Sequence, residues 1–215
     1  MQVRKSINNL RREYKLNKLS EETVQKNPFK QFDKWFGDVL KSGLIEPNAM
    51  VLATSDAKGN PSARVVLLKG LTKTGFKFFT NYSSRKGKLL TENSAVSLLF
   101  FWAELERQVR IEGRIKKLSR TESQKYFNTR PLQSRLAAWS SEQSEMIPSR
   151  DHLETRFQII KRQFKGKKIP APTDWGGYIL EPGYFEFWQG RENRLHDRIC
   201  FKKTNKGWNI FRLAP

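Results

Sequence analysis

The fold is decided by residues 49–81, which read AMVLATSDAKGNPSARVVLLKGLTKTGFKFFTN. Three β-rich runs, AMVLATSD, PSARVVLLK and GFKFFTN, are separated by a KGN turn and by a second turn that contains glycine. Short apolar runs that are bounded by turn residues are typical of an antiparallel meander. This stretch therefore predicts consecutive strands of one antiparallel sheet.

The same pattern continues towards the C-terminus. Further strands are predicted at SAVSLLFFW (94–102), RQVRIEGRIKKL (107–118), YILEPGYFEFWQG (178–190), RLHDRICFKK (194–203) and GWNIFRLAP (207–215). The stretch IPAPTDWGG (169–177) is expected to be a loop because it is rich in proline. Closely spaced strands with few helices between them favour a β-barrel.

Helices are expected beside these strands. Residues 28–42 start with Pro28, repeat apolar residues at helical spacing and stop before Gly43, which predicts an amphipathic helix. A short helix is predicted for RKGKLL after a capping Ser84, and residues 119–165 predict helices interrupted at Pro131. The expected class is mainly β with flanking helices (α+β).

The length of 215 residues suits one domain. Residues 1–27 are polar and lack enough apolar residues for a core element, so we expect a mobile segment with a short helix. Residues 28–215 are expected to form the single domain. No apolar run reaches the length of a membrane span and no secretory signal is seen, which favours a cytoplasmic location.

The composition restricts the chemistry. A net charge of +20 favours anionic partners, either nucleic acid or phosphorylated small ligands. The single cysteine, Cys200, and the two histidines exclude a Cys/His zinc cluster, and no metal site is expected. No paired carboxylates, GxSxG elbow, P-loop or GxGxxG fingerprint occurs, so the reaction chemistry must come from a cofactor.

Two segments are candidate anion sites. In residues 64–69, RVVLLK, two cations bracket four apolar residues, and strand alternation places Arg64 and Lys69 on opposite faces unless a bulge intervenes. In FTNYSSRK (79–86), a strand end leads into a capped helix start that carries Arg85 and Lys86, a sound arrangement for a phosphate. Edge charges on a core strand and a capped surface helix are the structural alternatives.

Two further groups of residues could bind a ligand. Tyr126, Arg130 and Ser134 would line one face of a continuous helix, but Pro131 disfavours helical geometry at Arg130 and can split that face. In a strand, Arg194, His196 and Arg198 would share one face, which repels itself unless it meets an anion.

Taken together, the motifs resemble one family, the pyridoxamine 5'-phosphate oxidases, along nearly the whole chain. The segments are LRREY, RVVLLK, NYSSRK, SLLFFW, LERQVRIEG, YFNTRPLQSRLAAWSS, FWQGRENRLHDR and RLAP. The resemblance implies an antiparallel split β-barrel and a homodimer with FMN at the subunit interface. It also implies an oxidase that converts pyridoxamine and pyridoxine 5'-phosphates to pyridoxal 5'-phosphate, with O2 as acceptor and H2O2 as product.

The resemblance also implies roles for individual residues. The flavin contacts would be Arg64, Val65, Val66, Leu67, Leu68, Lys69, Phe79, Thr80, Arg85, Lys86, Gln108, Gln143, Ser144, Trp188 and Arg198, some of them from the partner subunit. The substrate phosphate would be bound by Lys69, Tyr126, Arg130 and Ser134. Arg194 and His196 would be the catalytic pair over the pyridine ring, and Arg11 and Tyr14 would belong to a segment that closes over the substrate.

Two positions depart from the family pattern. Phe79 stands where a tyrosine is expected, which is harmless if that position acts through its backbone, and Arg110 adds a cation to a strand that is usually apolar. Two other functions stay open. A flavin- or PLP-binding split-barrel protein without activity would keep the FMN residues but lose the substrate residues, all of which are present. A nucleic-acid-binding protein would explain the charge, but no nucleic-acid motif occurs.

Overall fold

The computed structural model describes residues 12–215, and these residues form two compact units. Unit 1 comprises the described residues up to Pro47 together with Leu99–Ile111 and Gly183–Pro215. Unit 2 comprises Asn48–Leu98 and Glu112–Pro182. Each unit is described by itself below.

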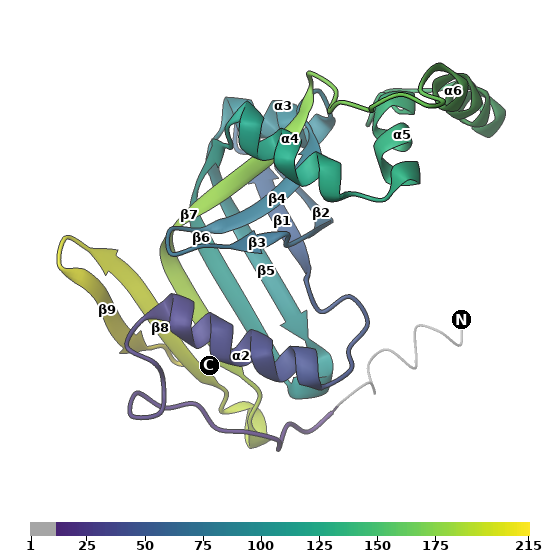
Figure 1. Cartoon of the computed structure of the whole chain (residues 1–215). Coiled ribbons are helices and arrows are strands. Elements are labelled where there is room, and N and C mark those ends of the chain that lie inside the picture. The colour runs from purple at the N-terminus through teal and green to yellow at the C-terminus, as the bar shows by residue number, and fades with distance from the viewer. Residues whose placement is uncertain (1–11) are drawn as a thin grey trace, which may run out of the picture. The chain divides into compact units, whose positions relative to one another are not determined.

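Nine strands of the described chain form one sheet with the order β2-β1-β5-β6-β7-β4-β3, and β8 pairs with both β7 and β9 (Figure 1). The ladders β1–β2, β3–β4, β4–β7, β7–β8 and β8–β9 are antiparallel. The strand bounds are β1 Ala49–Ser55, β2 Pro61–Leu67, β3 Gly70–Leu71, β4 Phe76–Asn81, β5 Ala95–Trp102, β6 Arg107–Lys117, β7 Trp175–Gln189, β8 Asp197–Thr204 and β9 Gly207–Arg212. Strands β5, β6 and β7 each run from one unit into the other.

Helices accompany the sheet, which confirms the predicted class of mainly β with flanking helices. Their bounds are α2 Pro28–Lys41, α3 Arg85–Glu92, α4 Arg120–Thr129, α5 Leu132–Ser140 and α6 Arg150–Gln163, with short 3-10 turns η1 at Ala103–Leu105 and η2 at Glu192–Arg194. The helices therefore start and end close to the predicted positions, and α4 and α5 are separated at Pro131 as expected.

Unit 1 is built on helix α2 (Figure 1). The Asn27 side chain caps this helix by accepting hydrogen bonds from the amides of Phe29 and Lys30, and Pro28 occupies the first turn. The apolar face of the helix packs on the sheet, with the Phe32 ring 5.1 Å from the Phe100 ring, centroid to centroid. The Trp35 ring packs in the same way on Phe187 of β7, at 5.3 Å between centroids. The helix therefore fixes the unit 1 end of β7, which carries the candidate residue Trp188.

The segment before α2 is packed more closely than its sequence predicts. Leu19 and Val24 are each only 4 % exposed and belong to the buried core. Residues 12–27 contain turns but no helix, so the expected short helix is absent from this part, and residues 1–11 lie outside the described chain. The prediction that the segment lacks core residues was wrong, because two well-placed apolar side chains are enough to anchor a short segment.

Unit 2 contains the antiparallel meander that was predicted for residues 49–81. Strands β1 and β2 pair from Ala49 opposite Leu67 to Ser55 opposite Pro61. The turn between them is closed by Asp56, whose carboxylate accepts hydrogen bonds from the amides of Lys58 and Asn60, each at 2.9 Å. Strand β4 pairs in turn with the start of β7, residues 175–180, and this ladder joins the segment after α6 to the sheet of unit 2.

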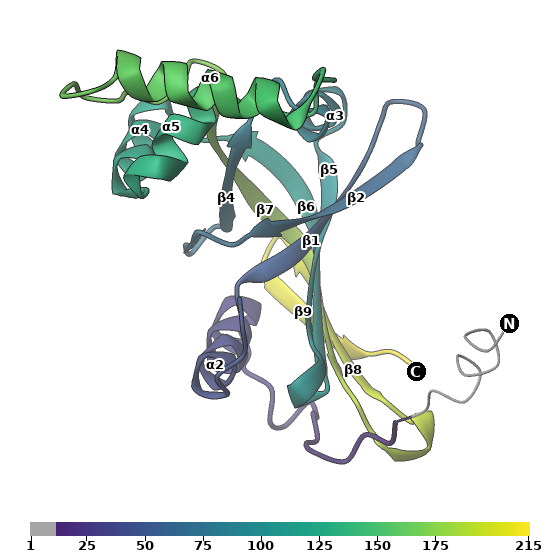
Figure 2. The ribbon, with the colours of Figure 1, turned by 90° about the vertical axis from the view of Figure 1, so that its right-hand side faces the viewer.

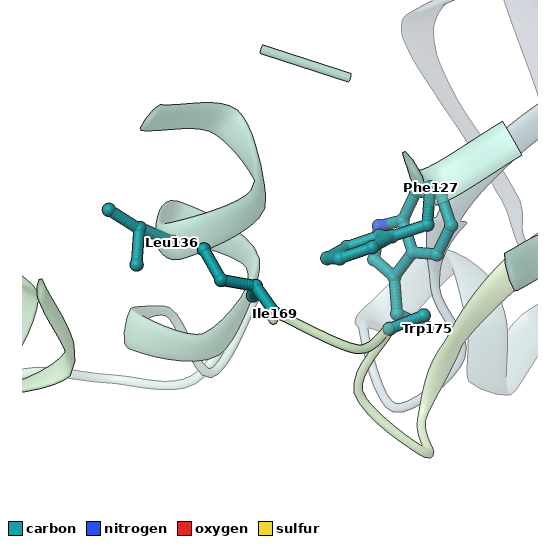
Figure 3. Close-up of a cluster of buried hydrophobic side chains, with 5 residues drawn as sticks. Phe127, Leu136, Ile169 and Trp175 are labelled. Carbon is teal, nitrogen blue, oxygen red and sulfur yellow. The ribbon is translucent and has the colours of Figure 1, made fainter. Parts of the chain in front are cut away.

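Helices α4 and α5 are joined to β7 by a small apolar cluster (Figure 3). It consists of Phe127, Leu136, Ile169, Ala171 and Trp175. Figure 3 shows the Phe127 and Trp175 rings together, and their centroids are 4.9 Å apart. Helix α6 lies beside α5 (Figure 2). The cluster therefore holds the helical wall of the pocket described below.

The structure corrects three details of the predicted strands. Strand β7 begins at Trp175, inside the predicted proline-rich loop, because residues 175–180 pair with β4. Strand β2 ends at Leu67, so Lys69 lies outside it, and the Lys69 amide donates to Lys77 at the start of a short extra pairing, β3 with β4. Strand β8 begins at Asp197, and Arg194 lies in the preceding 3-10 turn.

Candidate active site

The structure groups the predicted site residues in two cavities, one in each unit. The cavity of unit 2 measures about 460 Å³ and is lined by Val65, Val66, Leu67, Lys69, Phe79, Thr80, Asn81, Lys86, Tyr126, Arg130, Ala137, Ala138, Ser141, Gln143 and Trp175. Its lining contains three cations and no carboxylate. A half-apolar cavity of this size with several convergent cations suits a phosphorylated aromatic ligand.

Three predicted FMN residues meet at one wall of this cavity. The Lys86 ammonium donates to the Thr80 hydroxyl at 3.1 Å and to the Gln143 side-chain oxygen at 2.9 Å. The Thr80 hydroxyl donates to the same Gln143 oxygen at 3.0 Å. Residues from β4, from α3 and from the segment after α5 are thus fixed together.

Burial shapes the charge of this wall. Burial lowers the pKa of the Lys86 ammonium, and the positive charge of Arg64 lowers it further. Burial also lowers the pKa of Arg64, with a contribution from Arg85. Arg85 thus disfavours the charge of Arg64, and Arg64 disfavours that of Lys86. Since no carboxylate lines the cavity, an anion bound at this wall would stabilise these charges.

Arg64 is close enough for its charge to act on Lys86, although it is not part of the cavity lining. Its guanidinium donates to the Leu52 carbonyl at 3.0 Å, to the Thr54 hydroxyl at 2.8 Å and to the Ser62 hydroxyl at 2.6 Å. Arg85 is exposed at the start of α3, where Ser84 accepts a hydrogen bond from the Gly87 amide as its N-cap. The capped helix start is confirmed.

The predicted substrate-phosphate residues are split by Pro131. Arg130 ends α4 in an extended conformation, and Ser134 belongs to α5. Tyr126 and Arg130 line the cavity with Lys69, whereas Ser134 does not. The face is therefore split at Pro131, the alternative that the sequence left open, because the residue before a proline avoids helical geometry.

Arg130 is prepared for an anionic partner. Its Nη1 atom is buried and has no hydrogen-bond partner among the described residues, and its guanidinium lies 4.9 Å from the centre of the Trp175 ring. Burial lowers the pKa of this guanidinium. A buried guanidinium nitrogen without an acceptor is costly unless a ligand supplies one.

Phe79, a departure from the family pattern, acts through its ring as well as its backbone. Its backbone pairs with Gly177 in the β4–β7 ladder. Its ring stacks on Tyr126 and, at 5.6 Å between centroids, on Trp175. Phe79, Tyr126 and Trp175 therefore form a flat apolar wall beside the cations.

The cavity of unit 1 measures about 580 Å³ and is lined by Arg12, Glu13, Tyr14, Arg191, Asn193, Arg194 and His196. The predicted catalytic pair, Arg194 and His196, and the predicted contact Tyr14 thus share one cavity. The rings of Tyr14 and Trp188 lie 5.6 Å from each other, and the His196 ring lies 4.7 Å from that of Trp188. Arg11 lies outside the described residues.

Arg194 is held by an unusual backbone. Asn193 and Arg194 both have positive φ angles, 54° and 61°, a backbone conformation that residues other than glycine seldom adopt. The turn takes Arg194 out of the strand, so the predicted shared face of Arg194, His196 and Arg198 was wrong. Positive-φ residues of this kind are frequent where a site fixes a side chain in one direction.

The surroundings of His196 favour its neutral form. Burial lowers its pKa below 6.5, and the charge of Arg194 lowers it further, whereas Asp197 opposes both. The His196 Nδ1 atom accepts a hydrogen bond of 3.1 Å from the Arg191 amide. The ring proton must then be on Nε2, which leaves an N–H donor for a ligand.

Arg198 and the second departure, Arg110, both bind one buried carboxylate. Glu186 is 3 % exposed and accepts from Arg198 Nε at 2.8 Å and from Arg110 Nη2 at 2.5 Å. A second nitrogen of Arg198 donates to the Ala214 carbonyl at 2.7 Å. The extra cation of this strand is therefore part of a buried ion-pair cluster in unit 1.

The remaining predicted flavin residues are divided between the units. Gln108, Trp188 and Arg198 belong to unit 1, and Ser144 and Leu68 belong to unit 2 outside the cavity lining, with Leu68 buried. Sequence reasoning missed Trp175 and Ser141 in one cavity and Arg191 and Asn193 in the other. The RENR segment held a signal for Asn193, since asparagine tolerates positive φ.

Residues 12–215 contain no group of three or more His, Cys, Asp or Glu side chains that could bind a metal ion. In the same residues, no helix is long and apolar enough to cross a membrane.

The chain matches two family models. Residues 36–163 match the model described as pyridoxamine 5'-phosphate oxidase, and residues 175–215 match the C-terminal dimerisation region of pyridoxine 5'-phosphate oxidase. The second match supports a homodimer.

Close relatives agree over nearly full length. The pyridoxine/pyridoxamine 5'-phosphate oxidase of Cupriavidus necator is 55 % identical over 207 residues, which cover 96 % of this chain and 97 % of that protein. The protein of the same name from Trichormus variabilis is 52 % identical over 98 % of this chain and 99 % of that protein.

Solved structures show the same fold. PhzG from Burkholderia lata, solved with tetrahydrophenazine-1-carboxylic acid, has a TM-score of 0.87 at 28 % identity and covers 93 % of this chain and 99 % of that chain. An FMN binding protein from Nostoc punctiforme, related to pyridoxamine 5'-phosphate oxidase, has a TM-score of 0.70 at 14 % identity, over 89 % of this chain and 100 % of that chain.

The curled antiparallel sheet and its flanking helices define a protein of the split β-barrel class, which confirms the predicted fold. Within that class, the chain belongs to the pyridoxamine 5'-phosphate oxidase family. The expected oxidoreductase activity and FMN cofactor agree with this membership.

Proposed function

We propose that the chain is an FMN-dependent oxidase that converts pyridoxamine and pyridoxine 5'-phosphates to pyridoxal 5'-phosphate and reduces O2 to H2O2. The observation that carries the proposal is the unit 2 cavity, where Lys69, Lys86 and Arg130 converge without a carboxylate in the lining. Both the cofactor and the substrate carry a phosphate, and the cavity supplies cations for such groups. A cytoplasmic location stays a prediction.

The residues fit FMN. Lys86, Thr80 and Gln143 form one polar cluster, and Arg64 and Arg85 add positive charge near its phosphate end. Val65, Val66 and Leu67 offer an apolar edge in the same cavity. FMN, when bound, supplies a ring that takes two electrons from the substrate carbon and returns them to O2.

The protein contributes binding and orientation. Lys69 and Arg130 neutralise the substrate phosphate beside the aromatic wall of Phe79, Tyr126 and Trp175. Arg194 holds the pyridine ring and stabilises negative charge that develops on it, and neutral His196 donates a hydrogen bond from Nε2. Fixing the reacting carbon in one place removes much of the entropic cost of the reaction.

The catalytic pair and the phosphate residues belong to different units of one chain. We assign them to one active site that is completed across a homodimer, with FMN at the subunit interface and Gln108, Trp188 and Arg198 from the partner as flavin contacts. The match to a dimerisation region supports this assignment.

An anaerobic titration tests the proposal. The holoenzyme receives pyridoxamine 5'-phosphate without oxygen while the flavin absorbance is followed, and air is then admitted. The expected result is bleaching that recovers in air, with pyridoxal 5'-phosphate formed. A flavin that binds but never bleaches would favour the binding protein without activity, and failure to bind FMN would contradict the whole proposal.

A further inference from the structure

Glu106 is a buried carboxylate that no proposed catalytic step uses. It follows the η1 turn in unit 1, is 2 % exposed and has a φ angle of 55°. Its carbonyl accepts hydrogen bonds from the Gly190 amide at 2.7 Å and from the Gln189 side chain at 3.1 Å. The backbone of Glu106 is thus fixed to the end of β7, beside the unit 1 cavity.

The carboxylate of Glu106 binds the segment that carries Tyr14. Its Oε2 atom accepts hydrogen bonds from the amides of Lys15 at 2.8 Å and Leu16 at 3.0 Å, across about ninety residues of sequence. Its Oε1 atom lies 3.6 Å from the guanidinium of Arg12. Two consecutive amides on one ionised oxygen form charge-assisted hydrogen bonds, which are stronger than neutral ones.

Tyr14 lies directly against Gly190, the residue that donates to Glu106. A Cβ atom at position 190 would come within 2.7 Å of the Tyr14 ring, so only glycine leaves space for that ring. Tyr14 also makes edge contacts with the rings of Trp188 and His196, both at 5.6 Å between centroids. The place of Tyr14 in the cavity wall therefore depends on the segment being held close to Gly190.

Apart from the Tyr14 ring, the other contacts of residues 12–16 with the rest of unit 1 are long and exposed: Lys15 lies 3.8 Å from the Glu192 carboxylate, and Arg12 donates to the Ala103 carbonyl at 3.5 Å. Residues 12–16 form no helix or strand, and all except Tyr14 are exposed. The next anchor along the chain is the Leu19 amide, which donates to Asp197 at 3.1 Å. Glu106 is thus the nearest buried group that can fix Tyr14.

We propose that Glu106 is a positioning residue, which holds Tyr14 as the wall of the substrate cavity formed with Arg194 and His196. This inference rests on the proposed function, because it assigns the unit 1 cavity to the substrate. Glu106 is not among the residues that line either cavity, and its effect passes through the amides of Lys15 and Leu16.

The test replaces Glu106 with Ala and with Gln in the holoenzyme, with Glu104→Ala as the matched control. Glu104 is an exposed carboxylate on the same turn. We expect Glu106→Ala to raise KM for pyridoxamine 5'-phosphate at least tenfold, with a smaller change in kcat and FMN affinity unchanged. Glu106→Gln keeps an acceptor oxygen and should raise KM several-fold, and it carries the test if the Ala variant does not fold.

A double-mutant cycle separates positioning from general support of the fold. In a Tyr14→Ala background, Glu106→Ala should change KM less than twofold, since the side chain it positions is gone. A KM within twofold of wild type in Glu106→Ala, or the same increase with and without Tyr14, would overturn the proposal.

Limited digestion with trypsin gives a readout independent of activity. Arg12 and Lys15 are exposed cleavage sites, and their cleavage in the folded Glu106→Ala holoenzyme should be at least tenfold faster than in wild type or Glu104→Ala. An inactive wild-type enzyme would refute the proposed function, while unchanged digestion would refute the positioning role alone.

Discussion

The rings of Phe79 and Tyr126 stack face to face, with 3.8 Å between their centroids and 17° between their planes. Phe79 comes from β4 and Tyr126 from α4, so this contact ties the sheet to the helix that ends in Arg130. Position 79, where the family pattern suggests tyrosine, thus has a packing role. The aromatic ring fills this role, and a hydroxyl group on it is not needed.

Replacing Phe79 with leucine should weaken substrate binding. The lost stacking is worth about 0.5–1.5 kcal/mol, so KM for pyridoxamine 5'-phosphate should rise roughly two- to tenfold in steady-state assays. Phe79→Tyr keeps the ring and serves as the control, with KM within twofold of wild type. An equal loss in both variants would contradict a role for stacking.

Replacing Lys86 with methionine should lower FMN affinity at least tenfold, measured by flavin fluorescence quenching. Because burial and Arg64 lower the pKa of Lys86, FMN affinity of the wild type should fall as pH rises, starting below the value of 10.5 typical of an exposed lysine. Lys86→Arg keeps its charge and should lose this dependence. If the FMN affinity of the wild type were constant up to pH 10.5, the charge of Lys86 would not contribute to FMN binding.

The acid limb of kcat/KM should report His196. Since its pKa lies below 6.5, activity should be constant at neutral pH and fall only below 6.5, where the protonated ring loses its bond with the Arg191 amide. His196→Gln should remove this limb. His152, the other histidine, is exposed on α6, and His152→Gln should leave the profile unchanged. An acid limb that persists in His196→Gln would show that another group causes it.

Removing the Glu186 carboxylate should destabilise the fold. Glu186→Leu leaves Arg198 and Arg110 without their shared partner. Because both guanidinium groups are partly exposed, the loss should be about 1.5–3 kcal/mol, which corresponds to a fall in Tm of roughly 3–12 °C. Arg110→Met leaves the Arg198 pair intact and should cost less. Equal losses of Tm would show that the remaining Arg198–Glu186 pair contributes nothing to stability.

The same carboxylate gives stability a pH dependence. Burial raises the pKa of Glu186, but its hydrogen bonds to Arg198 and Arg110 outweigh this, so the net pKa is lowered. A lowered carboxyl pKa stabilises the fold above the unfolded value, and this contribution is lost as pH falls through the folded value. Thermal unfolding of wild type and Glu186→Leu should therefore converge in acid.

Mixed dimers test the shared active site. Arg130→Leu and Arg194→Leu should each be nearly inactive as homodimers. If each site takes one group from each subunit, a purified heterodimer has one intact site and should recover about half of wild-type activity. If both groups act within one chain, every site in the heterodimer is damaged and no activity returns.

The sequence predicted the elements whose signals are local. The meander of β1 and β2 followed from alternation and turn residues, and α2 from its proline start and helical spacing. Trp175 was assigned to a loop because the prolines beside it carry a strong local signal, whereas its pairing with Asn81 is a long-range contact. Local patterns do not encode such partners.

The same division applies to the candidate site. Lys86 and Thr80 were predicted together because they are neighbours in one motif, and the structure joins them to Gln143. Glu106 was missed, since its partners, the amides of Lys15 and Leu16, lie about ninety residues away and carry no side-chain signal. Buried carboxylates that bind backbone amides are found only once the fold is known.

Gly190 has a consequence for enzyme engineering. The absence of a Cβ atom there is what lets the Tyr14 ring sit against the backbone. A larger residue at this position would displace the ring without altering Arg194 or His196, and so would widen the entrance while the catalytic groups stay in place. Libraries aimed at bulkier vitamers could therefore start at a residue that makes no polar side-chain contact with the substrate.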